Sequence, residues 1–273
     1  MTAFILIVLG FVCGSFINAL VWRLYEKDNK NISKKVNLSI LNGRSVCPNC
    51  YHVLSVKDLL PVFSWIMLGG KCRYCKKPIS IQYPLVELSS AFVFLFSYLY
   101  WPHNISGQYL FSFIVWLFVS IGLIALIVYD LRWMQLPNSL TFPLIGVVFI
   151  EIIIRSIFWP GGRVLLESSL WSVLIIFGLF YLIYWVSKGS WIGGGDVKLA
   201  ILIGLLVADP ILALLTIFFA SIMGTLTSIP LLMSGKLKAK SLIPFGPYLI
   251  IATFIIVFFG AQIVSWYKGL LTL

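Results

Sequence analysis

The chain has 273 residues, of which 60% are hydrophobic, 16% aromatic and only 11% charged, and its formal net charge is +11. A single soluble core cannot bury so many apolar side chains, so this composition excludes an ordinary globular protein and indicates a polytopic membrane protein. The positive charge lies in loops between apolar spans and the chain carries no nucleic-acid-binding motif, so we expect no nucleic-acid partner.

Eight apolar runs follow one another along the chain, most of them near the ~20 residues that cross a bilayer as a helix. They cover residues 3–22, 84–101, 110–129, 139–159, 165–187, 197–208, 211–233 and 245–267. The sequence therefore predicts an all-α polytopic membrane protein with about eight transmembrane helices. The sixth run has about twelve residues, ~18 Å of helix, and cannot span the ~30 Å hydrocarbon core alone.

Basic residues set the expected orientation. If the amino terminus lies outside, 17 of the 20 lysines and arginines fall in cytoplasmic segments, including Lys236, Lys238 and Lys240. This bias follows the positive-inside rule. We therefore expect a multi-pass protein of the bacterial cytoplasmic membrane, in contact with membrane lipids, whose third helix ends and whose sixth helix begins at the cytoplasmic face.

Residues 23–83 form the one sizeable soluble segment, which we expect to be a cytoplasmic module between a first helix at 1–22 and a seven-helix transmembrane domain at 84–273. Two C-x2-C pairs lie in it, 21 residues apart: Cys47 with Cys50, and Cys72 with Cys75. This spacing is close to that of four-cysteine zinc sites. So short a domain also needs a disulfide or a structural metal to be stable. The pattern predicts a closed, structural Zn²⁺ site. Two disulfides or a redox dithiol are the alternatives, and a cytoplasmic location argues against stable disulfides.

Two aspartates lie at the ends of apolar runs. Asp130 closes "LIALIVYD", and Asp196 follows three glycines in "WIGGGD". An ionised aspartate in hydrocarbon costs roughly 2.5 to 3.5 kcal/mol, so such a residue is a functional hypothesis by default. Taken singly, a helix N-cap or an ordinary interfacial residue explains each of them almost as well.

The sequence around the aspartates favours chemistry over capping. Gly193 and Gly195 remove side chains beside Asp196, which a cap alone does not require. Pro137 and Asn138, soon after Asp130, can end one helix and start the next. The two histidines of the chain lie in the module and in an outer loop, so a serine or cysteine nucleophile that needs a histidine has little to work with.

Two carboxylates held close together cannot both ionise, so they share a proton. One can then act as base on a water while the other acts as acid on a carbonyl, which is the chemistry of aspartic proteases. Two alternatives remain. One is a proton- or ion-coupled transporter that uses the aspartates as relay groups, and the other is an aspartyl protease that cuts within transmembrane segments.

Six blocks of the chain, in order, resemble the type IV prepilin peptidases, which are GxGD-type aspartic proteases of the membrane. The two cysteine pairs form one block, and the others are "GSFINALVWRL", "ISIQYPLVEL", "YDLRWMQLPNSLTFP", "GGGDVKL" and "IPFGPYL". The resemblance implies that Asp130 and Asp196 are the catalytic aspartates and that Gly193 and Gly195 are the glycines of the GxGD motif. Many relatives carry a second aspartate where this chain has Arg132, a departure that alters the local charge.

The implied substrate is a type IV prepilin or pseudopilin, of a pilus or a protein-secretion system, with a short basic leader before an apolar helix. Members with the four-cysteine module commonly also methylate the new amino terminus with S-adenosyl-L-methionine. Gly70 and Lys71, just before Cys72, are candidates for the methyl-donor site, although a turn glycine and a solvated lysine are the simpler interpretation. We also expect "GSWIGG" to dip below the membrane surface and line a water-accessible cleft.

Overall fold

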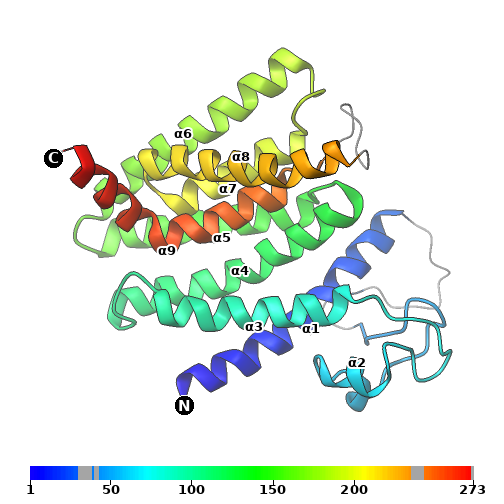
Figure 1. The fold of residues 1–273 in the computed structure, drawn as a ribbon. Coiled ribbons are helices and arrows are strands. Elements are labelled where there is room, and N and C mark those ends of the chain that lie inside the picture. The colour runs from blue at the N-terminus through cyan, green and yellow to red at the C-terminus, as the bar shows by residue number, and fades with distance from the viewer. Residues whose placement is uncertain (30–38, 40–42, 235–242, 272–273) are drawn as a thin grey trace. The chain divides into compact units, whose positions relative to one another are not determined.

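The computed structural model describes residues 1–29, 39, 43–234 and 243–271, so Lys236, Lys238 and Lys240 lie outside the described residues. Within them the fold is helical, and the only β-type pairing there is two isolated bridges in the cysteine module. The chain divides into two compact units, Met1–Tyr100 and Trp101–Leu273 (Figure 1).

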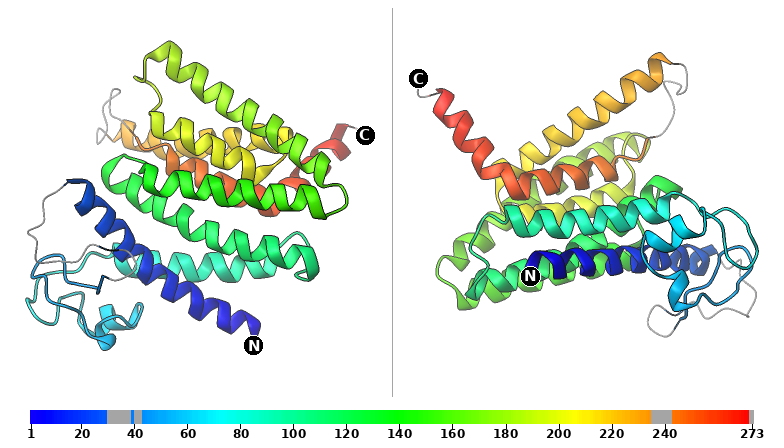
Figure 2. Two further views of the ribbon diagram at one scale, coloured as in Figure 1. Left: turned by 180° about the vertical axis from the view of Figure 1, so that it is seen from behind. Right: turned by 60° about the horizontal axis from the view of Figure 1, so that its bottom comes forward.

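The first unit consists of two long helices and the small module between them. Helices α1 (Thr2–Asn29) and α3 (Gln82–Tyr100) pack side by side. The module contains a 3₁₀ turn, η1 (Val56–Asp58), and a short helix, α2 (Phe63–Met67), and it lies at the end of the pair where α3 begins (Figure 2).

Two glycines of α1, one helical turn apart, let its backbone approach α3. A β-carbon built on Gly10 would lie 2.6 Å from the α-carbon of Ala91, and one built on Gly14 would lie 2.5 Å from the α-carbon of Glu87. Membrane helices associate closely where small residues recur every four positions, because lipid supplies no hydrophobic drive for packing. The "GFVCG" stretch therefore fixes how α1 meets α3.

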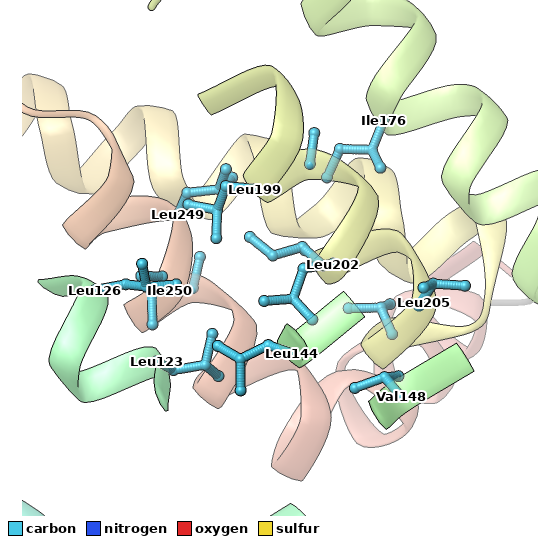
Figure 3. Close-up of a cluster of buried hydrophobic side chains, with 14 of the residues drawn as sticks. Leu123, Leu126, Leu144, Val148, Ile176, Leu199, Leu202, Leu205, Leu249 and Ile250 are labelled. Carbon is cyan, nitrogen blue, oxygen red and sulfur yellow. The ribbon is translucent and has the colours of Figure 1, made fainter. Parts of the chain in front are cut away.

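The second unit is a bundle of six helices: α4 (Gly107–Trp133), α5 (Asn138–Phe158), α6 (Gly162–Ser187), α7 (Gly194–Val207), α8 (Pro210–Met233) and α9 (Gly246–Leu271). Helix α7 contacts α5, α6, α8 and α9 and is buried along most of its length. Figure 3 shows side chains of α7, such as Leu199 and Leu202, meeting Leu126 of α4, Leu144 of α5 and Leu249 of α9. The shortest helix of the bundle is thus its centre.

Seven helices among the described residues are long and apolar enough to cross a membrane, and α7 is not one of them. It has 14 residues, or ~21 Å at 1.5 Å per residue, because Ala208 leaves the helix in a left-handed conformation and Asp209 caps α8. Beyond its last turn lies a cavity of about 320 Å³, whose lining includes Val207 and Ala208 as well as Glu151. The predicted fold class is confirmed, including a sixth apolar helix too short to span.

Replacing Gly14 with alanine tests the close approach of α1 to α3. The added methyl group must displace the α3 backbone, so we expect a loss of about 1 to 3 kcal/mol, the range for overpacked sites, measured by thermal unfolding in detergent. Gly146→Ala is the matched control, because a β-carbon there meets nothing within 4 Å and alanine favours a helix. Equal stability of the two variants would contradict the contact.

Candidate active site

Asp130 lies in the last turn of α4, and its side chain reaches the first residue of α9. Helix α4 ends because Met134 adopts a left-handed conformation, its N–H donating to the Asp130 carbonyl oxygen at 2.8 Å. The Asp130 carboxylate is buried and accepts a hydrogen bond from the backbone N–H of Gly246. A β-carbon built on Gly246 would lie 2.6 Å from Asp130 Oδ2, so only glycine leaves room for this carboxylate.

Asp196 is the third residue of α7, and its side chain turns back to the start of its own helix. The N-cap position belongs to Gly193, whose backbone N–H donates to the Asp196 carboxylate. Asp196 is therefore not the N-cap of α7, which was the alternative to a catalytic role in the sequence analysis. The Asp130 carboxylate thus faces the N-terminus of α9 and the Asp196 carboxylate that of α7, where free N–H groups and the helix dipole favour negative charge.

The two carboxylates belong to one site. Asp130 and Asp196 are close enough to repel one another electrostatically, although 65 residues separate them in the sequence. Leu136, in the loop after α4, packs beside both helix starts. A β-carbon on Gly195 would lie 3.1 Å from Leu136 Cβ, and one on Gly246 would lie 3.6 Å from Leu136 Cδ1. The end of α4 and the starts of α7 and α9 thus meet around one leucine.

The predicted supporting residues Pro137 and Asn138 connect this region to α5. Pro137 is the N-cap of α5, and its carbonyl oxygen accepts a hydrogen bond from Thr141 Oγ1 at 3.1 Å. The Asn138 Oδ1 accepts a hydrogen bond from Lys198 Nζ of α7 at 2.8 Å. This bond ties the first turn of α5 to the first turns of α7, next to Asp196.

Other residues near the site carry weaker sequence signals or none. The role of Gly246 can be anticipated only in that a Gly-Pro pair opens the last apolar run. Nothing in the sequence singles out Leu136, because a leucine in an apolar protein is unremarkable by type and spacing. Arg132 is exposed and lies over the ring of Trp133, at 5.3 Å from its centroid.

In the first unit, both C-x2-C pairs adopt the same tight turn. The N–H of Tyr51 donates to the Cys47 carbonyl oxygen at 2.9 Å, and the N–H of Lys76 donates to the Cys72 carbonyl oxygen at 3.0 Å. Tyr51 and Lys76 each have a φ of 58°. Such a conformation is uncommon for a residue with a side chain, so each turn is specified by the hydrogen bonds and cysteines around it.

The four thiols converge. The Sγ atoms of Cys47, Cys50, Cys72 and Cys75 all lie within 4.8 Å of one another, and those of Cys47 and Cys75 are 3.9 Å apart. No disulfide joins them. Four sulfurs at ~2.3 Å from a tetrahedral zinc ion would be roughly 3.8 Å apart, so the cluster is compatible with Zn²⁺.

Burial and hydrogen bonding shift the pKa values of two of these thiols in opposite directions. Burial raises the pKa of the Cys47 thiol to about 12. At Cys72, hydrogen bonds from the backbone of Cys75 and Tyr74 outweigh the effect of burial and lower the pKa of the thiol to about 7. A divalent cation would therefore find a thiolate at Cys72 near neutral pH and would displace a proton at Cys47.

Asp58 links the two halves of the module. Its carboxylate accepts hydrogen bonds from Ser55 Oγ at 2.7 Å, Arg73 Nε at 2.7 Å and Tyr74 OH at 3.1 Å. Burial alone would raise the pKa of Asp58, but these hydrogen bonds lower it to about 2. The carboxylate thus stays charged at neutral pH and holds η1 against the second cysteine turn.

The candidate methyl-donor residues have a structural explanation. Gly70 adopts a φ of 68°, and a β-carbon there would lie 3.0 Å from the ring of Trp65. Lys71 is exposed. A turn that needs glycine and a solvated lysine therefore account for both residues, and their role towards a methyl donor stays a prediction.

Two protein-family models match the chain. The Bacterial Peptidase A24 N-terminal domain matches residues 8–101, and the Type IV leader peptidase family matches residues 117–229. The second match includes Asp130 and Asp196. No solved structure is significantly similar to the chain.

Several similar proteins from different bacteria share a name. The prepilin leader peptidase/N-methyltransferase of Stutzerimonas stutzeri is 32% identical, over 97% of this chain and 94% of that protein. The protein of that name from Pseudomonas aeruginosa is also 32% identical, over 97% and 93%. The one from Vibrio cholerae is 31% identical, over 94% and 96%. These matches extend over nearly the full length of this chain and of each relative.

A double-mutant cycle tests the contact between Gly246 and Asp130. Gly246→Ala should cost about 1 to 3 kcal/mol of stability, because its methyl group overlaps the Asp130 carboxylate. In an Asp130→Ala background the same change should cost clearly less, since the overlapping atoms are gone. Thermal unfolding of the four proteins measures this coupling, with Gly178→Ala as a glycine control that meets nothing within 4 Å. Additive effects would contradict the contact.

Proposed function

The chain belongs to the type IV leader peptidase family, and we propose that Asp130 and Asp196 are its catalytic pair. One observation carries the proposal. Two carboxylates from distant segments come close enough to repel one another, and each receives a backbone N–H from a glycine. Like charges at such a distance hold one proton between them, which supplies a base and an acid in one site.

We propose that the substrate is a type IV prepilin or pseudopilin with a basic leader. The support is the name of the relatives from Stutzerimonas stutzeri and Pseudomonas aeruginosa, prepilin leader peptidase/N-methyltransferase, together with the apolar helices of this chain. A substrate with its own apolar helix would lie in the bilayer, with its leader junction at the membrane surface. The transporter alternative has no support among these relatives.

The proposed reaction is hydrolysis without a covalent intermediate. The ionised carboxylate takes a proton from a water as its oxygen attacks the scissile carbonyl carbon, while the protonated carboxylate donates to the carbonyl oxygen. Collapse of the tetrahedral intermediate then breaks the C–N bond, and a proton passes to the leaving nitrogen. The pair titrates as a unit, so neither role is assigned to one aspartate.

The helix starts assist this chemistry. Asp130 faces the N-terminus of α9 and Asp196 that of α7, so both helix dipoles favour the single negative charge that the pair carries. Asp196 is only half-buried, and water can therefore reach the pair from its side. The buried Asp130 is held in place by Gly246.

We place this site at the cytoplasmic face of the bacterial inner membrane, from the distribution of basic residues. In this arrangement residues 1–22 form the first membrane helix, residues 23–83 the cytoplasmic module and residues 84–273 the peptidase domain. Residues 189–194 then dip below the membrane surface and admit the scissile peptide to the aspartates. The placement puts the pair at the level where a leader joins its apolar helix.

We propose that the same protein methylates the amino terminus that cleavage exposes. S-adenosyl-L-methionine would supply the methyl group, as the relatives' name implies. Cys47, Cys50, Cys72 and Cys75 would hold a structural zinc ion that keeps the module folded. Gly70 and Lys71 remain our candidates for the methyl-donor site because they directly precede the second cysteine pair.

Asparagine variants test the catalytic pair. Asp130→Asn and Asp196→Asn keep the size of the side chain and remove the ionisable group, so each should lower the cleavage rate of a purified prepilin in liposomes by about 10²- to 10⁴-fold. Binding of the prepilin should persist.

Asp209→Asn is the matched control for this experiment. Asp209 caps α8 by accepting hydrogen bonds from Ile211 N and Leu212 N, and asparagine caps helices equally well, so cleavage should be unchanged. Near wild-type cleavage by a folded Asp130 or Asp196 variant would remove that residue from the pair.

Metal analysis tests the cysteine cluster. The purified protein should contain one zinc ion per chain, and Cys72→Ser should lose it, whereas Cys13→Ser should retain it because Cys13 lies in α1 outside the cluster. Removing zinc with a chelator should abolish methylation while cleavage survives. Full zinc content in Cys72→Ser would refute the four-cysteine site, and loss of both activities on chelation would refute the separate role of the module.

A further inference from the structure

The cysteine module exposes an apolar face that its own fold does not cover. In α2, Phe63, Ile66 and Met67 are 69%, 63% and 82% exposed, and they lie on one face of the helix because of their i, i+3, i+4 spacing. Just before α2, Val56 is 81% and Leu60 49% exposed. We call Phe63, Ile66 and Met67 the α2 face. In so small a module, a cluster of this kind marks an interaction surface.

Hydrogen bonds hold the α2 face outward. On the opposite side of the helix, Trp65 Nε1 donates to the Ile79 carbonyl oxygen at 3.1 Å, and the Trp65 ring packs beside Gly70. The N–H of Ile79 donates to the Gly70 carbonyl oxygen at 2.7 Å, which closes the loop after α2. Rotation of α2 to bury its apolar residues would break these bonds.

The depth of α2 in the membrane follows from its hydrogen bond to α3. The N–H of Val62, the N-cap of α2, donates to Glu87 Oε2 at 2.7 Å. Helix α3 has 19 residues, ~28 Å, barely enough to cross the hydrocarbon core, so Gln82 must lie at the membrane surface. Glu87 is five residues further on, about 8 Å along the axis. The start of α2 is thus fixed beside the second turn of α3, and with Gln82 at the membrane surface this position lies below that surface.

The bond to Glu87 also stabilises a strained conformation. Val62 has a φ of 62°, which is disfavoured for a β-branched residue. Such a conformation persists only where surrounding contacts impose it. Here the contact is the hydrogen bond from the Val62 N–H to the carboxylate of the buried Glu87. The attachment of α2 to α3 is therefore specific.

Charge around the α2 face favours an anionic membrane surface. Between residues 43 and 80 the chain has six basic side chains and one acidic side chain, Asp58, which is paired with Arg73. The six, all exposed, are Arg44, Lys57, Lys71, Arg73, Lys76 and Lys77. An apolar helix face within a basic segment is typical of segments that lie in the headgroup region of anionic bilayers, about 5 to 10 Å deep.

We propose that the α2 face is a membrane-docking surface, with Phe63, Ile66 and Met67 inserted among the lipids of the leaflet that α3 enters. The docking goes beyond the proposed peptidase function and does not depend on Asp130 or Asp196. It holds the cysteine module flat against the bilayer, at the depth where α1 ends and α3 begins.

Photo-crosslinking tests the occupant of this face. The photoreactive amino acid benzoylphenylalanine replaces Phe63, Ile66 or Met67 in turn in the full-length protein, which is reconstituted in vesicles of phosphatidylglycerol and phosphatidylcholine. We expect lipid adducts at all three positions, detected by mass spectrometry, at several-fold higher yield than at Val53. Val53 is the control because it is 42% exposed in the first cysteine turn of the same module, outside the α2 face.

Yields at or below that of Val53, or adducts with protein only, would overturn the proposal. A second measurement excludes misfolding as the explanation. Met67→Asp should retain its metal content, and hydrogen exchange of the backbone amides of residues 59–70 should become faster in vesicles. Val53→Asp should leave that exchange unchanged. Unchanged exchange in Met67→Asp would show that lipid does not cover the α2 face.

Discussion

Carboxylates at the edge of a bilayer need hydrogen-bond donors supplied by the protein, because hydrocarbon supplies none. In this chain the donors are backbone N–H groups at helix starts, from Gly246 to Asp130 and from Gly193 to Asp196. Glycine is required where the Asp130 carboxylate touches the start of α9, since a β-carbon there would overlap it. The requirement to supply hydrogen-bond donors to these two carboxyl groups explains why the end of α4 and the starts of α7 and α9 converge.

The short helix α7 follows from the same requirement. Its start must lie beside Asp130, and its far end stops after 14 residues at Ala208, where the chain turns into α8. Packing on four sides by α5, α6, α8 and α9 stabilises a helix that could not cross a bilayer alone. Helix α7 is therefore a buried helix that positions Asp196, and the longer helices around it anchor the protein in the membrane.

In the first unit, a separate set of polar contacts holds the elements of the cysteine module and α3 together. Asp58 joins η1 to the second cysteine turn, and Glu87 joins α2 to α3. The four cysteines bring the two turns together, while Gly10 and Gly14 fix the spacing of α1 and α3. A module with little apolar core is thus organised by a metal-compatible cluster and two buried or partly buried carboxylates, which leaves its apolar side chains free to face lipid.

The sequence by itself determined the helical fold class, the eight apolar runs with a short sixth, and the two cysteine turns, because hydropathy and C-x2-C spacing are local properties of the chain. It also singled out Asp130 and Asp196, since a carboxylate beside an apolar run is costly wherever it folds. Only the tertiary structure decided what holds those carboxylates. Gly246 lies 116 residues after Asp130, Leu136 carries no signal in its residue type, and Glu87 accepts the N–H of a valine 25 residues earlier. Such contacts depend on how helices meet in three dimensions, which no local pattern records.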